Sequence, residues 1–130
     1  NLPFAETVRL IVEMQFDFAR QNPRLPYFIL SEVLSNKENL ALVIDVLYPK
    51  LSGIFGKIEK ILSDEIAKGV IRPVTIRDFM MNLLSLNIST FIALPILQEI
   101  FPVENDKIMN KILDERRESN VQFILNALKP

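Results

Sequence analysis

Hydrophobic side chains recur every three to four positions along most of the chain, which is the spacing of an amphipathic α-helix. The first segment of this kind covers residues 4–20. Its apolar face comprises Phe4, Val8, Ile11, Val12, Gln15, Phe18 and Ala19. Its opposite, charged face comprises Glu6, Arg9, Glu13, Asp17 and Arg20. The pattern therefore predicts a helix with one buried side and one solvated side.

Proline and capping residues mark the next two helices. The pair Asn22-Pro23 ends the first helix, and a short apolar helix is expected over residues 27–34. The stretch Ser35-Asn36-Lys37-Glu38 has the pattern of a capping box, so a third helix is expected from Lys37 to about Tyr48. Pro49 should kink this helix or restart it.

The second half of the chain carries equally clear boundaries. An apolar stripe runs from Leu51 to Lys68, and Gly69 is expected to cap it in the left-handed conformation. The stretch Thr75-Ile76-Arg77-Asp78 predicts the start of a long helix that runs to about Phe101 and is kinked at Pro95.

A last helix should follow Asn105 and run from Asp106 to about Leu128. The sequence contains no strand pattern, internal repeat or linker. Residues 1–130 are therefore predicted to form one all-α domain of about six helices with short loops.

The last two helices carry more apolar surface than one subunit of this size can cover. Residues 79–101 are apolar on most of the helix circumference, apart from a narrow polar stripe. Surplus apolar surface of this kind favours a homodimer in which the last two helices of each subunit form a four-helix bundle. The expected interface residues are Ser89, Ile92, Ile96, Arg116, Asn120, Phe123 and Ala127. The alternative is that both helices are simply central core.

Two polar residues interrupt the apolar face of the last helix. Arg116 and Asn120 could fix the register of the two subunits across a dimer interface. The alternative for Arg116 is that its long side chain reaches the surface along the protein.

Composition and charge exclude several function classes. The chain has 130 residues, a net charge of -1, and neither Cys nor His. Cys/His metal sites and His-based catalysis are therefore excluded, and no cofactor, metal or catalytic residue is expected. A net charge near zero supplies no basic field for DNA. The apolar runs are broken before 18 residues, so no membrane association is expected.

A small-molecule site is the best-supported chemistry. Gln15 and Asn87 each lie at the centre of an apolar helix face, and a buried amide without partners costs about 1–3 kcal/mol. A mostly apolar cavity between the first helix and the long helix would supply those partners. The expected ligand-binding residues are Gln15, Phe16, Phe55, Met80, Leu84, Asn87 and Phe91. The alternative is that the amides bond to backbone carbonyls or to buried water.

Four stretches resemble the C-terminal domain of TetR-family transcriptional regulators. They are Asn22-Pro23-Arg24-Leu25-Pro26-Tyr27-Phe28-Ile29-Leu30-Ser31-Glu32, Gly69-Val70-Ile71-Arg72, Phe91-Ile92-Ala93-Leu94-Pro95-Ile96-Leu97 followed by Phe101, and the closing helix from Glu115 to Pro130. Each motif is weakly specific alone, but their order and spacing cover essentially the whole chain.

The resemblance implies a cytoplasmic, non-enzymatic homodimer whose C-terminal domain senses a small apolar or amphipathic effector. It also implies that DNA is contacted only by an N-terminal helix-turn-helix domain, which would precede Asn1. The alternative function is a helical interaction or dimerisation module without a small-molecule ligand. An enzyme is the remote third possibility, because His and Cys are absent.

Overall fold

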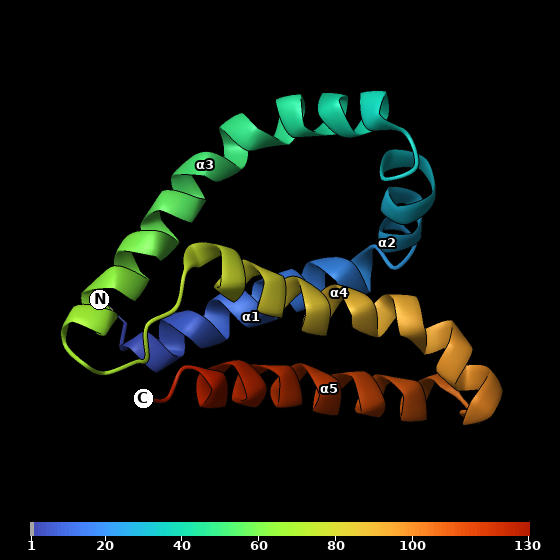
Figure 1. The fold of residues 1–130 in the computed structure, drawn as a ribbon. Coiled ribbons are helices and arrows are strands. Elements are labelled where there is room, and N and C mark those ends of the chain that lie inside the picture. The colour runs from blue at the N-terminus through green and yellow to red at the C-terminus, as the bar shows by residue number, and fades with distance from the viewer. Residues whose placement is uncertain (1) are drawn as a thin grey trace.

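The computed structural model describes residues 2–130, which form five α-helices and one π-helical segment (Figure 1). These elements are α1 (Phe4–Gln21), α2 (Leu25–Phe28), η1 (Ile29–Val33), α3 (Lys37–Ala67), α4 (Ile76–Ile100) and α5 (Asp106–Ala127). The described residues contain no strand, so the predicted all-α fold is confirmed. Asn1, before which a DNA-binding domain is expected, lies outside the described residues.

Polar caps define where the long helices begin. The Thr75 hydroxyl accepts a hydrogen bond from the backbone N–H of Asp78 (3.1 Å), as the sequence predicts. The Asn105 side chain likewise accepts one from Ile108 (3.0 Å). At α3 the cap is Asn36, which accepts from the N–H of Glu38 (3.0 Å). Ser35 is therefore not the cap, because its hydroxyl donates to the carbonyl of Ser31 in the preceding turn instead.

The prolines within α3 and α4 do not end their helices. α3 continues through Pro49 and α4 through Pro95, which reduces the number of separate helices below the expected six. Figure 1 shows α3 as a bent helix, in keeping with the predicted effect of Pro49. Gly69 has φ of 73°, so it provides the left-handed residue expected after α3.

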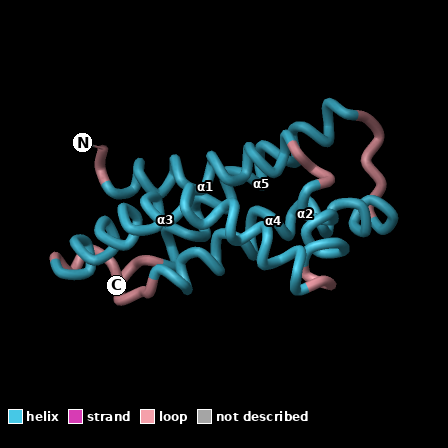
Figure 2. Tube along the Cα trace, turned by 90° about the horizontal axis from the view of Figure 1, so that it is seen from above, coloured by secondary structure: helices cyan, strands magenta, loops and turns pink. Residues whose placement is uncertain are grey.

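The helices α1, α4 and α5 lie side by side and form the body of the molecule (Figures 1 and 2). One core cluster joins α1 and α4 to α5 and to the C-terminal half of α3, and its buried members include Val12, Ile58, Leu83 and Val121. A second cluster is centred on Phe16, whose ring lies 5.2 Å from that of Phe91. We refer below to Phe79, Leu83, Asn87 and Phe91 as the buried row of α4.

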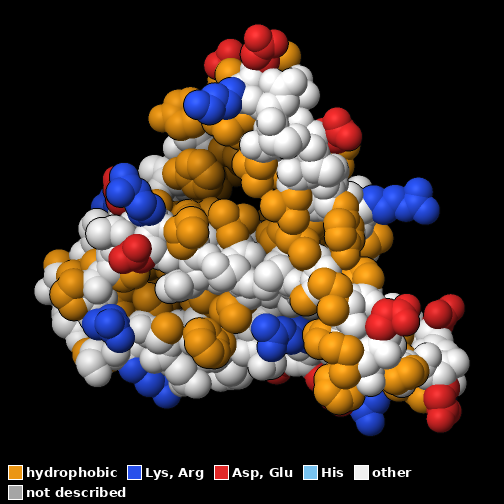
Figure 3. Space-filling view, turned by 45° about the vertical axis from the view of Figure 1, so that its right-hand side comes forward, with side chains coloured by type: hydrophobic (Ala, Val, Ile, Leu, Met, Phe, Trp, Pro, Cys, Tyr) orange, Lys and Arg blue, Asp and Glu red, His pale blue; other side chains and the backbone are white. Residues whose placement is uncertain are grey.

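The segments α2, η1 and α3 form an arch that rises from the body (Figure 1). The C-terminal half of α3 is anchored to the core through Ile58 and Leu62. No residue from 37 to 57 is buried, so the N-terminal half of α3 stands away from the body. Figure 3 shows a hollow beneath this part of the arch, with hydrophobic side chains around it.

The predicted solvated face of α1 is only partly solvated. Arg117 of α5 lies between Glu13 and Asp17, with N–O distances of 2.9 and 2.8 Å. Arg9 and Arg20 of α1 pair with carboxylates of α5 as well. Charged residues of α1 therefore fasten it to α5, although the sequence of α1 alone gave no sign of this partner.

By length and composition alone, α4 is apolar enough to cross a membrane. This differs from the expectation based on uninterrupted apolar runs, because its few polar residues are uncharged over residues 79–98. A core helix of a globular domain meets the same criterion, and α4 packs against α1, α3 and α5, although only 17% of its apolar window is buried.

Candidate functional site

The hollow beneath the arch takes one wall from α4. On the α5 side of this helix, Thr90 accepts a hydrogen bond from Nε of Arg116 (3.4 Å). At about 100° per residue, Met80, Leu84 and Ile88 fall on the opposite side of the buried row, facing the arch. Met80 and Ile88 are half-buried, whereas Leu84 is 44% exposed. An exposed leucine on an inward side is expected where the facing space is not filled.

The second wall comes from α3. Leu51 and Phe55 continue the helical stripe of Ile58 and Leu62, which are packed into the core. Both remain half-buried because the helix diverges from the body at this point. Phe55 therefore lies at the boundary between the packed core and the hollow.

A hydrogen bond closes the ring of helices around the hollow. The Tyr27 hydroxyl in α2 donates to the backbone carbonyl of Ile92 in α4 (2.7 Å). Continuous chain from α2 through η1 leads to α3, and α3 returns to α4 through Ile58 and Leu62. The Tyr27 contact therefore holds α2, where the arch begins, against α4.

The α4 wall and the adjoining segment of α3 carry no charged side chain. Residues 79–98 of α4 and residues 51–56 of α3 include no Asp, Glu, Lys or Arg. Such a surface cannot compensate the charge of a polyanion or of a metal ion. It is suited to an uncharged, largely apolar molecule.

The predicted amides lie elsewhere, in a packed interface. Asn87 is 0% exposed, and its Nδ2 donates to the carbonyl of Val12 and to Oε1 of Gln15, both at 3.0 Å. Its Oδ1 accepts from Nδ2 of Asn120 (2.9 Å). These three amides connect α1, α4 and α5.

The described residues therefore give no support to the cavity predicted between the first helix and the long helix. Phe16 is 0% exposed and Phe91 is buried, and the two rings pack against each other. The Asn87 amide is satisfied by Val12, Gln15 and Asn120. Sequence periodicity alone could not distinguish this arrangement from satisfaction by a ligand.

Of the predicted ligand-binding residues, helix periodicity places Met80 and Leu84 on the arch side of α4, where Met80 also packs against the core. Phe55 is half-buried on α3. The other four, Gln15, Phe16, Asn87 and Phe91, belong to the packed interface.

The predicted interface residues also divide. Ser89, Ile96, Arg116 and Phe123 are exposed, and Ile92 and Ala127 are half-buried. Asn120 is corrected, because its side chain is buried within the subunit against Asn87 and is not available to a partner. Its Oδ1 has no hydrogen-bond partner among the described residues.

A shallow groove between α4 and α5 lies beside the exposed interface residues. It has a volume of about 290 Å³, and its walls include Ser89, Ala93, Leu97, Ile112 and Arg116. The groove exists because α4 has small residues there, such as Ser89 and Ala93, and most of its other lining residues are apolar. A groove of this shape can accept side chains from another helix.

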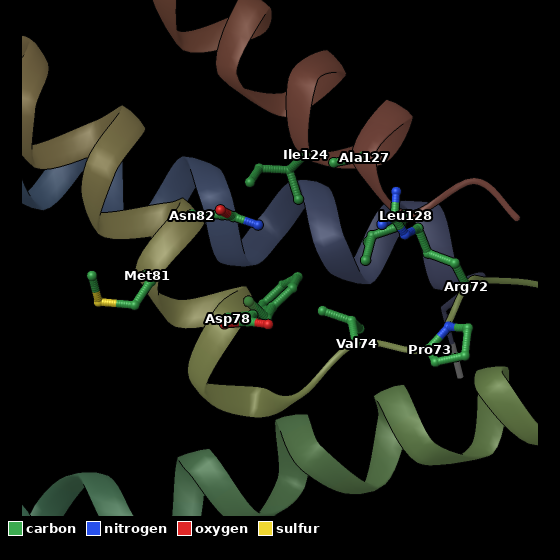
Figure 4. A pocket seen from close by; sticks show the side chains of 10 residues that line it. Arg72, Pro73, Val74, Asp78, Met81, Asn82, Ile124, Ala127 and Leu128 are labelled. Atoms are coloured by element: carbon green, nitrogen blue, oxygen red, sulfur yellow. The ribbon is translucent and has the colours of Figure 1, made fainter.

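Sequence reasoning missed a second cleft, near the chain's C-terminus. It has a volume of about 280 Å³ and lies between the loop before α4, the first turns of α4 and the end of α5. Figure 4 shows Asp78 and Asn82 of α4, with Arg72 of the loop, around an apolar floor formed with Ile124 and Leu128. The backbone N–H of Arg72 donates to the carbonyl of Leu128 (2.9 Å), which fastens the loop to α5.

Together these features define an all-helical domain in which a three-helix body carries an arch over an uncharged hollow. Residues 5–124 match the family model described as the tetracyclin repressor-like C-terminal domain, and the chain belongs to this family. No curated protein and no solved structure gives a significant match. The resemblance inferred from the four sequence stretches is thereby confirmed.

Membership of the family places the chain in transcription regulation. Domains of this family typically dimerise and bind small effectors, with DNA contacted through an N-terminal domain. The proteins that carry them are generally non-enzymatic. Among the described residues, no group of three or more Asp or Glu side chains could hold a metal ion.

Proposed function

We propose that this chain is the effector-sensing and dimerisation domain of a cytoplasmic TetR-like repressor. The effector is a small apolar or amphipathic molecule, and the hollow beneath the arch holds it. DNA binding belongs to an N-terminal helix-turn-helix domain that the effector controls. The chain itself provides no cofactor, metal or catalytic residue in this scheme.

The observation that carries the proposal is the uncharged hollow. Figure 3 shows hydrophobic side chains around it. Leu84, which helix periodicity places on the arch side of α4, is 44% exposed although it is apolar. Apolar surface left in contact with water costs about 25 cal/mol per Å². A ligand that covers this apolar surface gains that free energy, so the hollow favours the binding of an apolar molecule.

The experiment adds an uncharged lipophilic dye, Nile red, and compares two arginine variants. Leu84→Arg places a charge on the inner side of the hollow and should weaken dye binding tenfold or more, because the charge would have to be buried beside the dye. Leu10→Arg is the matched control, because Leu10 is 45% exposed and lies on the side of α1 away from α4. Equal dye binding by both variants and the parent would locate the site elsewhere.

We also propose that the homodimer forms through α4 and α5. Its seam contains Ser89, Ile92, Ile96, Arg116, Phe123 and Ala127, and a partner helix packs over the groove between the two helices. Large apolar side chains, with Ile96 62% exposed and Phe123 60% exposed, support this choice.

Light scattering tests the dimer. Phe123→Asp should give a monomer at tens of micromolar protein, because a carboxylate would be buried in the seam. Phe18→Asp is the matched control, since Phe18 is also an exposed phenylalanine but lies on α1. A monomeric parent chain contradicts the proposal.

The alternative is a dimerisation module without a ligand. The packed Gln15–Asn87–Asn120 interface favours it, because the amides expected to contact an effector bond to one another instead. The two functions differ in the dye experiment. A dimeric parent that binds no apolar probe would support the module.

A further inference from the structure

The cleft near the chain's C-terminus carries polar groups that the proposed function does not use (Figure 4). Its floor is apolar and firmly packed, because Phe79, Ile124 and Leu128 are 1%, 2% and 4% exposed. The hydrogen bond from the N–H of Arg72 to the carbonyl of Leu128 holds the loop before α4 against the end of α5. The residues of one subunit therefore hold the cleft open without a ligand.

Three polar side chains surround this floor. Figure 4 shows those of Asp78 and Asn82 on one side of the cleft and that of Arg72 on the other. All three residues are exposed, and within residues 2–130 none of these side chains hydrogen-bonds or ion-pairs with another part of the protein. A guanidinium, a carboxylate and a carboxamide therefore keep their hydrogen-bonding capacity for a molecule that enters from solvent.

These groups together select one chemical class of ligand. At neutral pH the side chains of Arg72 and Asp78 carry opposite charges. A guanidinium binds a carboxylate through two parallel hydrogen bonds, and a carboxylate binds an ammonium group through charge-assisted ones. The apolar floor between them can cover an apolar side chain.

We propose that this cleft binds the zwitterion of a free apolar amino acid. The carboxylate of the ligand pairs with Arg72, its ammonium group pairs with Asp78, and its side chain rests on the floor. Asn82 can donate to the carboxylate or accept from the ammonium group. The cleft volume of about 280 Å³ lies near the lower end of the range for small-molecule sites, which suits a ligand of this size.

The cleft is separate from the hollow beneath the arch. None of its ten lining residues lies on α2, η1 or α3, and Ala127 alone among them is also expected in the dimer seam. An amino acid in the cleft and an apolar effector in the hollow should therefore bind independently. Saturating phenylalanine should leave Nile red binding unchanged, and displacement of the dye would overturn the assignment of two sites.

Amide NMR spectra of the whole chain, titrated with free L-phenylalanine, locate the site. We expect saturable changes at residues 72–82 and 124–128 and none at residues 37–57. Phenylpropionate lacks the ammonium group and phenethylamine lacks the carboxylate, so each should bind about tenfold more weakly through the loss of one charge-assisted contact. No saturable change at millimolar phenylalanine, changes centred on α3, or equal affinity for phenylpropionate would overturn the inference.

Variants test the two charged contacts. Arg72→Gln and Asp78→Asn should each weaken phenylalanine binding about tenfold. Arg77→Gln is the matched control, because Arg77 is also an exposed arginine near the start of α4 but does not line the cleft. Equal losses in Arg72→Gln and Arg77→Gln would contradict a specific site. Circular dichroism checks the folding of each variant, and Asn82→Leu, which should also weaken binding, replaces Asp78→Asn if that variant loses its helices.

Discussion

At the scale of single residues, the most constrained group is the Asn87 amide. The amide is buried. Its Nδ2 donates to the carbonyl of Val12 in α1, and its Oδ1 accepts from Asn120 in α5. A buried hydrogen-bonding group that loses its partner pays its full desolvation cost, whereas a pair removed together pays much less. The amide chain therefore stabilises the body only as a complete unit.

Asn87→Leu should lower the free energy of unfolding by about 1–3 kcal/mol, because Asn120 Nδ2 would lose the Asn87 oxygen that accepts its hydrogen bond. The double variant Asn87→Leu/Asn120→Leu should recover part of that loss, since it removes both polar partners. Urea denaturation of the two single variants and the double variant measures this coupling. Strictly additive losses would show that the two amides do not depend on each other.

The amide positions illustrate what periodicity can and cannot predict. The spacing of apolar residues correctly placed Asn87 at the centre of a buried face. It could not show that Asn120 lies opposite, because the two residues are 33 positions apart on helices whose relative rotation depends on packing. For this reason Asn120 was expected in the seam and Asn87 in a ligand site.

At the scale of elements, α1 and α5 are joined by ion pairs as well as by apolar packing. The Arg9 side chain hydrogen-bonds to Glu118 and thereby lowers the pKa of that carboxyl below its ordinary value of 4.5. The pKa values of Arg9 and Arg117 are raised by their carboxylate partners, so both stay charged at any working pH. Only the carboxylates can therefore make this junction sensitive to acid.

A lowered folded-state pKa means that the Glu118 contribution is present above about pH 4.5 and is lost as the pH falls through the folded value. Thermal melts between pH 6 and 3 should show a smaller decrease of Tm for Glu118→Gln than for the parent chain. The effect is modest, because the side chain is exposed. Glu115→Gln, on the same helix, should follow the parent, and identical curves for all three proteins would contradict the assignment.

Element boundaries were largely accessible from sequence because caps act locally. Thr75 and Asn105 bond to backbone N–H groups only three residues away. Ser35 and Asn36 compete for the same role, and the choice depended on the turn formed by the end of η1. Pro49 left two outcomes open, and α3 continues through it as one bent helix.

At the scale of the whole molecule, the hollow was the feature that sequence could not locate. Its walls come from helices whose apolar stripes look like ordinary core, as with Leu51 and Phe55. The divergence of α3 from the body leaves those side chains half-buried rather than fully packed, and this depends on the bend of α3 and on the Tyr27 contact. The family resemblance indicates a ligand cavity, and the amides led to its prediction on the α1 side of α4 rather than at the hollow.

The arch and the body should differ in local stability, which leads to the last prediction. Residues 37–57 contain no buried side chain, whereas α1, α4 and α5 share two core clusters. Segments with few buried apolar contacts open at a lower free energy than the core and exchange their amide hydrogens faster. Hydrogen exchange read by mass spectrometry should therefore show faster exchange in α2, η1 and residues 37–57 than in α4.

A saturating apolar ligand in the hollow should slow exchange mainly in the arch, because it supplies the missing contacts. Tyr27→Phe should accelerate arch exchange and leave α5 unchanged, since it removes only the hydrogen bond to Ile92. Uniform exchange across arch and body, or ligand protection confined to α5, would contradict this division of the molecule.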